Sequence, residues 1–391
     1  MKTILTKRIQ QLEPSPTFAL DSRVKAMQKE GIPVVNLSIG EPDFDTPEFI
    51  GSAGKKAITD GFTHYTQVAG ILELRQAVAE KFKKDNTLIY QSSQIMIGTG
   101  SKPILYCAFQ VLCEKGDEVI IPVPTWSSYV EQVKLTEAKP ILIHLLPPFK
   151  LTAKMVKEKI TKKTKVILLN TPSNPTGAMI EKGELQKIAQ LAVKHNLWVI
   201  TDEMYEKIIY GTSKHVSIAS FGKEIYERTI TINGFSKKYA MTGWRLGYAG
   251  GPEEVIKAMA DLQGQLTASA PTISQKAGLV ALTGPKGPIQ KMIREFAKRR
   301  TVLIRELTKI PQLEVTESEG SFFFFIGIQK LLGKEYPTAI AWCEALLKEK
   351  QVAVIPGEAF FAPGFFRLSF AAPIEKLQIA TQRIKEFINE S

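Results

Sequence analysis

Short apolar runs recur along the first 250 residues, and helix-like stretches separate them. The runs lie at 94–97, 118–121, 140–143, 165–169, 197–200, 229–232 and 246–249. Their apolarity is continuous rather than alternating, which is typical of strands that helices cover on both faces. The pattern predicts an α/β fold in which a large domain holds a mostly parallel, doubly wound sheet of seven strands.

The last hundred residues show a different pattern. From Gly287 to about Ile310, apolar residues recur at helical spacing among basic ones, which predicts one long amphipathic helix between two domains. Strands at 321–326, 352–355 and 367–370, with helices near 340–348 and 375–387, predict a smaller α+β domain. The run Phe322 to Phe325 could suggest an aromatic cage, but a core strand is the commoner use of such a run. We therefore predict an N-terminal arm joining the small domain (1–45), a large domain (46–286), and an interdomain helix with a small C-terminal domain (287–391).

Composition narrows the class of protein. The chain has 391 residues, of which 44% are hydrophobic, so it can bury a large core. The first fourteen residues offer only Ile4 and Leu5 as an apolar pair, and no run is long enough to cross a bilayer. Three cysteines without metal-ligand spacing and only four histidines predict reduced thiols and no metal site. We expect a cytoplasmic protein with no membrane partner.

The formal charge of +12 raises the question of nucleic-acid binding. The densest lysine cluster, between Lys154 and Lys165, lacks interleaved aromatic residues and is typical of a solvated helix face. We therefore expect no nucleic-acid partner, although the positive field could attract acidic substrates.

Polar or small residues end several of the predicted strands, where ligands of doubly wound sheets bind. Lys237 lies on the turn after the run 229–232, a poor place to solvate an ammonium group. A lowered pKa would make its amine a nucleophile toward carbonyl groups, and Arg245, eight residues later, could hold an anion. This pairing predicts a Schiff-base lysine beside a phosphate.

Asp202 lies just after the apolar run 197–200, at the carboxyl end of the predicted strand, and Tyr205 follows three residues later. An aspartate of this kind can keep a pyridine nitrogen protonated, and Tyr205 could reach the phenolic oxygen of the same ring. Helix N-capping is the commoner use of such an aspartate. In combination with Lys237, however, the pattern favours the cofactor interpretation.

Three further stretches carry candidate chemistry. Ser101 and Lys102 precede a helix whose first N–H groups could bind a phosphate, although an ordinary Ser-capped helix fits equally well and no regular Gly-x-Gly-x-x-Gly is present. Trp126 follows a strand and could stack on a ring or belong to the core. Arg367 lies in a very apolar stretch and could hold a carboxylate bidentately or pair with Glu358.

These segments resemble the motifs of class I pyridoxal-phosphate aminotransferases. The segment 233–245 resembles their cofactor-lysine motif, and 170–177 resembles their Asn-x-Pro-x-Asn-Pro-Thr-Gly signature. The resemblance implies fold type I of the pyridoxal-phosphate-dependent transferases, with an internal aldimine at Lys237 and a hydrogen bond from Asn174 to the ring hydroxyl. It also implies a phosphate site completed by Ser236 and Arg245, stacking by Trp126, and an α-carboxylate clamp at Arg367.

The resemblance extends to the N-terminal region. It implies that the Gly40 backbone meets the substrate and that Tyr65 reaches the phosphate of the neighbouring subunit, so a homodimer with shared sites is expected. Lys102 and Thr17 match residues of thermophile-type bacterial aspartate aminotransferases, where the lysine binds the distal carboxylate. The expected reaction is therefore amino transfer from aspartate to 2-oxoglutarate.

Several alternatives stay open. Relatives that also use prephenate carry a lysine directly before the Pro-Ser of this region, where this chain has Glu13. That charge reversal argues against prephenate and weakens the dicarboxylate preference, so an aromatic or glutamine-type aminotransferase is the second choice. A pyridoxal-dependent C–S lyase would share Lys237 and Asp202. A sugar- or nucleotide-binding protein, or a regulatory domain derived from an aminotransferase, would bind a ligand without turnover.

Overall fold

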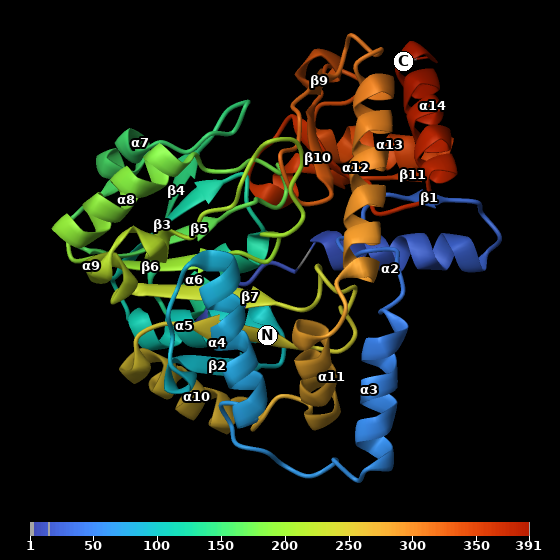
Figure 1. Ribbon diagram of the computed structural model, residues 1–391. Helices are drawn as coiled ribbons and strands as arrows, with labels where there is room; N and C mark the ends of the chain where they lie inside the picture. The colour runs from blue at the N-terminus through green and yellow to red at the C-terminus, as the bar shows by residue number, and fades with distance from the viewer. Residues whose placement is uncertain (1–3, 15, 391) are drawn as a thin grey trace.

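A seven-stranded sheet forms the larger part of the molecule and a four-stranded sheet the smaller part (Figure 1). The computed structural model describes residues 4–14 and 16–390. The strand order in the large sheet is β2-β8-β7-β6-β5-β3-β4. Its strands are β2 (Ile95–Gly98), β3 (Glu118–Val123), β4 (Lys139–His144), β5 (Thr164–Asn170), β6 (Trp198–Asp202), β7 (Thr229–Gly234) and β8 (Gly247–Gly250).

Only β8 runs antiparallel to its neighbours in this sheet; the other pairings are parallel. The predicted α/β architecture with a mostly parallel seven-stranded sheet is therefore confirmed. The parallel order follows from the helical crossovers, because parallel neighbours cannot be joined by a tight turn.

Helices cover both faces of the large sheet, which explains why its strands are continuously apolar. Val119 and Ile121 pack into one core cluster, while Ile120 between them packs into another on the opposite face. The same alternation divides Leu168 from Leu169. The helices of this part are α3 (Glu48–Thr59), α4 (Leu72–Asn86), α5 (Ser101–Leu112), α6 (Ser127–Leu135), α7 (Ala153–Lys159), α8 (Lys182–Lys194), α9 (Lys223–Tyr226), α10 (Glu253–Leu266) and α11 (Thr272–Thr283).

A single long helix, α12 (Gly287–Leu307), runs from the large part into the small part, as its periodicity predicted (Figure 1). The small sheet is antiparallel with order β12-β13-β10-β9. Its elements are β9 (Glu314–Val315), β10 (Phe323–Gly327), β12 (Ile355–Pro356) and β13 (Phe365–Ser369), with α13 (Ala339–Lys350) and α14 (Ile374–Glu390). All four residues from Phe322 to Phe325 are buried, which confirms the core-strand interpretation of that run.

The predicted strand at 352–355 is wrong as a single element. It is divided into β11 (Val352–Ala353) and β12, which join different sheets. β11 pairs in parallel with β1 (Val35–Asn36), which follows α2 (Pro16–Lys29) near the N-terminus; α1 (Lys7–Gln10) precedes α2. The division depends on this distant partner, so local apolarity could not indicate it. The exact domain boundaries stay a prediction.

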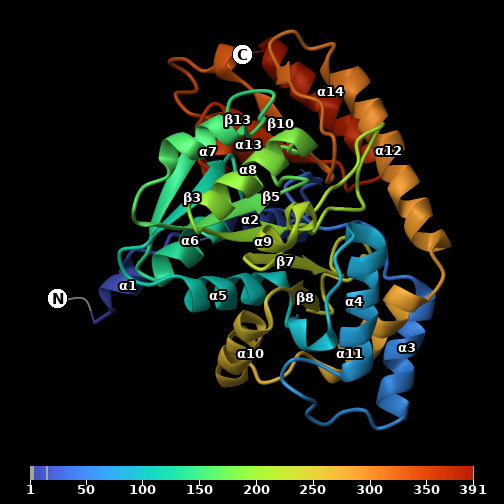
Figure 2. The ribbon, with the colours of Figure 1, turned by 60° about the vertical axis from the view of Figure 1, so that its left-hand side comes forward.

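The segment around Leu37 continues from β1 along β13, where the Ser369 N–H donates to the Leu37 carbonyl oxygen. This hydrogen bond holds the segment that follows β1 against the end of β13. Figure 2 shows the C-terminal part above the large sheet, with α12 running along one side from the large part toward α14. Among the described residues, no helix has both the length and the apolarity needed to cross a membrane.

Candidate active site

A cavity of about 660 Å³ opens where the carboxyl ends of the large-sheet strands face the small part. Side chains from both parts and from the N-terminal segment line it. Eleven of the thirteen residues expected from the sequence are among the lining residues: Gly40, Ser101, Lys102, Trp126, Asn174, Asp202, Tyr205, Ser236, Lys237, Arg245 and Arg367.

Lys237 lies on the turn after β7, all of whose residues are buried. Its Nζ donates to the carbonyl oxygen of Gly40, so the amine is aimed across the cavity at the N-terminal segment. Burial lowers the pKa of Lys237 to about 8; Glu41 opposes this change, while Arg367 and Arg245 add to it. A large fraction of the amine is therefore neutral near pH 8, as a nucleophile requires.

Asp202 ends β6 and is 4% exposed. Its Oδ2 accepts from the Tyr129 hydroxyl at 2.8 Å, and its Oδ1 accepts from the Met204 N–H at 3.1 Å. Burial raises the pKa of Asp202 to about 6, against the effect of both hydrogen bonds. The residues after Asp202 form a turn rather than a helix, so the helix-cap alternative is wrong. A buried carboxylate of this kind favours a cationic partner within the cavity.

A cradle for an anion lies at the start of α5. Gly100 precedes this helix with φ near +100°, and a Cβ added there would lie 2.6 Å from Arg245 Nη2. At Gly247, an added Cβ would lie 2.6 Å from the backbone nitrogen of Ser101. The cap position is Gly100, without a side-chain cap, so the Ser-capped alternative is wrong. Backbone N–H groups and a guanidinium thus converge where a phosphate would be stabilised.

Arg367, in β13 of the small part, is 2% exposed and lines the same cavity. Its Nη1 donates to Asn174 Oδ1 at 2.9 Å, and its Nη2 donates to the Ser38 carbonyl oxygen at 2.6 Å. The alternative of a pair with Glu358 is wrong: among the described residues, the terminal nitrogens of Arg367 contact Asn174 and Ser38, and Glu358 Oε1 accepts from the Ala339 N–H at the start of α13. Burial lowers the pKa of Arg367 to about 10. Both terminal nitrogens of this buried cation donate to neutral oxygens, an arrangement well suited to an anionic ligand.

The remaining expected residues stand as follows. The half-buried ring of Trp126 borders the cavity, with Lys102 Nζ 4.6 Å from its centroid. Burial lowers the pKa of Lys102, and the charge of Arg245 adds to this change. Tyr65 is 89% exposed and does not line the cavity of its own chain. The side chain of Thr17 lies outside the described residues.

Tyr129 is the main contact that the sequence analysis did not identify. Its ring is 1% exposed and meets Trp126 edge-on, with centroids 5.3 Å apart. It follows Trp126 by three residues at the start of α6, so helical spacing could have indicated it. Asp21, Lys25, Glu41, Met204 and Thr242 also line the cavity.

The residues present fit a flat cofactor with a phosphate at one end and a ring nitrogen at the other. The Gly100–Arg245 cradle would take the phosphate, and the buried Asp202 carboxylate would take a protonated nitrogen. The Lys237 amine and the Trp126 plate belong to the same cavity. Pyridoxal phosphate has this arrangement of groups.

Comparisons with known proteins place the chain in a family. Residues 32–384 match the family of class I and II aminotransferases. The chain is 41% identical to the aspartate aminotransferase of Bacillus sp. (strain YM-2) over 391 residues, covering 99% of this chain and 100% of that protein. The aspartate aminotransferase structure from Rhizobium meliloti is 40% identical with a TM-score of 0.95, covering 99% of both chains. The Thermus thermophilus aspartate aminotransferase structure with maleate is 37% identical with a TM-score of 0.94, covering 99% and 100%.

The chain therefore belongs to the class I and II aminotransferase family. It is a transaminase, and its family implies pyridoxal phosphate as the cofactor.

Proposed function

We propose that this protein transfers the amino group of L-aspartate to 2-oxoglutarate, with pyridoxal phosphate held at Lys237. One observation carries the proposal. The Lys237 amine lies in one cavity with a buried arginine fork, Arg367, and a second cation, Lys102. Two cations suit a substrate with two carboxylate groups, and aspartate and 2-oxoglutarate each have two.

The relatives support this choice of substrate. Several are named aspartate aminotransferases, and the Thermus thermophilus structure was determined with maleate, a four-carbon dicarboxylate. The matches cover almost the full length of both chains at about 40% identity, so there is little room for insertions that would change the lining of the cavity.

The protein would hold the cofactor at both ends. Asp202 would keep the ring nitrogen protonated, and Asn174 and Tyr205 would bond the ring oxygen. The start of α5 at Ser101, with Ser236 and Arg245, would hold the phosphate, joined by Tyr65 of the partner subunit in a homodimer. When bound, pyridoxal phosphate supplies an electron sink for charge that develops at the substrate α-carbon.

Lys237 would move the proton. Its Nζ would take the proton from the substrate α-carbon. The low pKa of Lys237, about 8, keeps the amine partly neutral and able to act as a base. Trp126 would cover the face of the ring and limit access of water to the reacting atoms.

Arg367 would bind the substrate α-carboxylate through its two terminal nitrogens. Asn174 and Ser38 already fix the orientation of this fork. Lys102, with Thr17, would bind the distal carboxylate. The excess of positive charge in the chain would raise the local concentration of dicarboxylates.

Prephenate is not part of the proposal, although the Aquifex aeolicus relative is named a probable aspartate/prephenate aminotransferase. The backbone N–H of Glu13 donates to the Glu131 carboxylate at 3.1 Å, and that carboxylate also pairs with Lys134. We propose that the acidic residue at position 13, in place of a lysine, disfavours prephenate. We also propose the cytoplasm as the compartment.

A panel of amino donors with 2-oxoglutarate tests the function. We expect yellow protein, fastest turnover with aspartate, and no transamination by Lys237→Ala. Faster turnover of phenylalanine or glutamine would favour the aromatic or glutamine-type alternative. Release of pyruvate and ammonia without any oxo acid would favour the C–S lyase. Colourless protein that stays colourless with added pyridoxal phosphate would refute the assignment.

A further inference from the structure

Buried charges lie directly behind the residues of the proposed active site. Asp202, Tyr205 and Lys237 line the cavity, whereas the next residue after each of them does not. Glu203, Glu206 and Lys238 instead belong to a polar cluster beside α4. The same short stretches of chain therefore carry the site residues and the buried charges.

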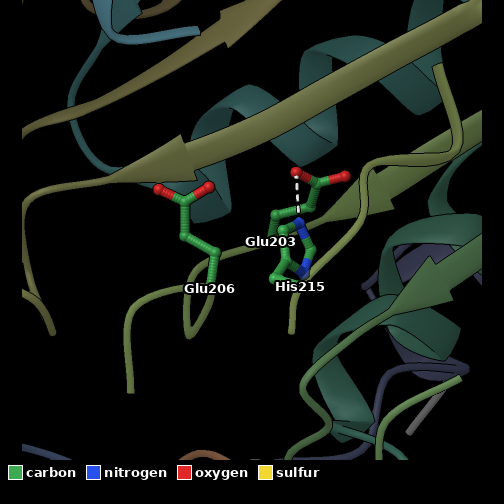
Figure 3. Close-up of side chains that lie close together, drawn as sticks. All are labelled: Glu203, Glu206 and His215. Atoms are coloured by element: carbon green, nitrogen blue, oxygen red, sulfur yellow. Dashed lines mark hydrogen bonds and ion pairs between the residues drawn. The ribbon is translucent and has the colours of Figure 1, made fainter. Parts of the chain in front are cut away.

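Glu203 is the centre of this cluster and is fully buried. Its Oε2 lies 2.9 Å from His215 Nε2 and accepts from Asn86 Nδ2 at 3.1 Å, and its Oε1 accepts from Thr201 at 3.3 Å. Figure 3 shows this carboxylate bonded to the imidazole, with the Glu206 carboxylate beside the pair. The network therefore joins the end of β6 to α4 and to the loop that carries His215.

Glu206 completes the network from the turn after β6. It forms an ion pair with Lys81 and accepts from the same Asn86 amide at 2.8 Å. Burial alone would raise the pKa of Glu206, but Lys81, His215 and Lys238 lower it to about 2. Burial lowers the pKa of His215, yet the carboxylates of Glu203 and Glu206 outweigh this effect and raise it.

The three ligand-type groups Glu203, Glu206 and His215 lie within 4.8 Å of one another, close enough to hold a metal ion. Lys81 pairs with Glu206, His215 pairs with Glu203, and the neutral Asn86 amide donates to both carboxylates. The cluster is therefore compensated by the chain itself, and its bonds act on the backbone of residues 203 and 206.

Bonds on both sides restrain the chain at this point. On the cavity side, the Asp202 carbonyl oxygen accepts from Asn170 Nδ2 at 3.0 Å. The Asp202 carboxylate accepts from Tyr129 and from the Met204 N–H.

The last ladder bond of β6 is the one from the Glu203 N–H to the Ile232 carbonyl oxygen, at 2.9 Å, and the chain then turns away from the sheet. The direction of the Asp202 side chain depends on this junction. On the side away from the cavity, the side-chain bonds of Glu203 to His215 and Asn86 hold the residue that follows Asp202.

We propose that the network of Glu203, His215, Asn86, Glu206 and Lys81 is a positioning device that holds the Asp202 carboxylate in line with the cofactor nitrogen. Glu203, bonded to His215, is its principal anchor. This inference rests on the proposed role of Asp202.

Two variants separate positioning from stability. Glu203→Gln keeps the side-chain shape and removes the charge that His215 and Asn86 hold. We expect kcat to fall about tenfold, since small displacements of catalytic groups slow the chemical step strongly. KM for aspartate should change by less than about twofold, because Glu203 does not touch the substrate site. The pH midpoint of the visible absorption of the holoenzyme, recorded without substrate, should move by about half a unit or more.

A matched pair at His215 provides the rescue. In His215→Gln, the amide nitrogen takes the place of Nε2 and still donates to Glu203, so we expect kcat and the absorption midpoint close to the original. In His215→Asn the amide is too short for that contact, and we expect the behaviour of Glu203→Gln. Glu184→Gln is the control, since Glu184 pairs with Lys187 on α8 and does not line the cavity.

Lower melting temperatures with unchanged kcat and unchanged absorption midpoint, in both Glu203→Gln and His215→Asn, would overturn the proposal and leave a purely structural network. Equal behaviour of the two His215 variants would also overturn it. Original protein that binds the cofactor but does not turn over aspartate would refute the substrate assignment alone, because the absorption measurement needs no substrate.

Discussion

Tyr129→Phe removes one hydroxyl group from the structure and tests the environment of Asp202. That hydroxyl donates to Asp202 Oδ2 at 2.8 Å, and both side chains are buried. Phenylalanine keeps the ring that contacts Trp126 edge-on. The substitution therefore changes the hydrogen bonding of the carboxylate with little change in packing.

The magnitude follows from the hydrogen bond. A bond to a charged group contributes about 1.5–3 kcal/mol, and about 1.4 kcal/mol corresponds to one pKa unit. Loss of this bond should therefore raise the pKa of Asp202 from about 6 by about one to two units. A carboxyl group with a raised pKa becomes neutral at higher pH, so the charged form is lost earlier as the pH falls. Near neutral pH about half to a tenth of the carboxyl groups would then stay charged, so we expect kcat to fall about twofold to tenfold.

The assay is the pH dependence of kcat/KM for aspartate with 2-oxoglutarate. Its acid limb should move upward by about one to two pH units in Tyr129→Phe. Tyr226→Phe is the matched control, because the Tyr226 hydroxyl donates to the Ile89 carbonyl oxygen away from the cavity. An unchanged acid limb together with an unchanged kcat in Tyr129→Phe would refute the reasoning.

Three further predictions concern the cradle, the lysine and the arginine. Gly100→Ala should weaken cofactor binding about tenfold or more in an absorbance titration, because its Cβ would crowd Arg245. Gly116→Ala, also at positive φ but with open space around it, should bind normally, and equal loss in both would contradict the cradle. Cofactor uptake by apoprotein should quicken as the pH rises through about 8, where Lys237 becomes neutral; a rate independent of pH would contradict this. Arg367→Lys should raise KM for aspartate about tenfold or more through loss of the bidentate fork, and an unchanged KM would exclude the proposed clamp.

Local sequence patterns predicted the strands of the large sheet because these strands are buried on both faces. Continuous apolar runs can be identified as buried strands without knowing their neighbours, and the polar residues that end them mark one edge of the sheet. Lys237, Asp202 and Asn174 were found in this way, together with their motifs. Helical periodicity likewise indicated α12.

Contacts between distant segments could not be predicted by the same means. Tyr129 is 73 residues from Asp202 in the chain, and Arg367 is 193 residues from Asn174. The division between β11 and β12 depends on β1, more than 300 residues earlier. No local signal distinguishes these pairings from others of the same composition.

The sequence by itself determined the order of elements, the large sheet and the residue types at its edge, since each depends on neighbours within a few positions. Tertiary structure alone decided which of the charged side chains face the cavity and which are buried behind it. Asp202 faces the cavity and Glu203 faces His215, although the two are adjacent. Successive residues at a strand end point to opposite faces, and only packing against α4 decides which face becomes the site.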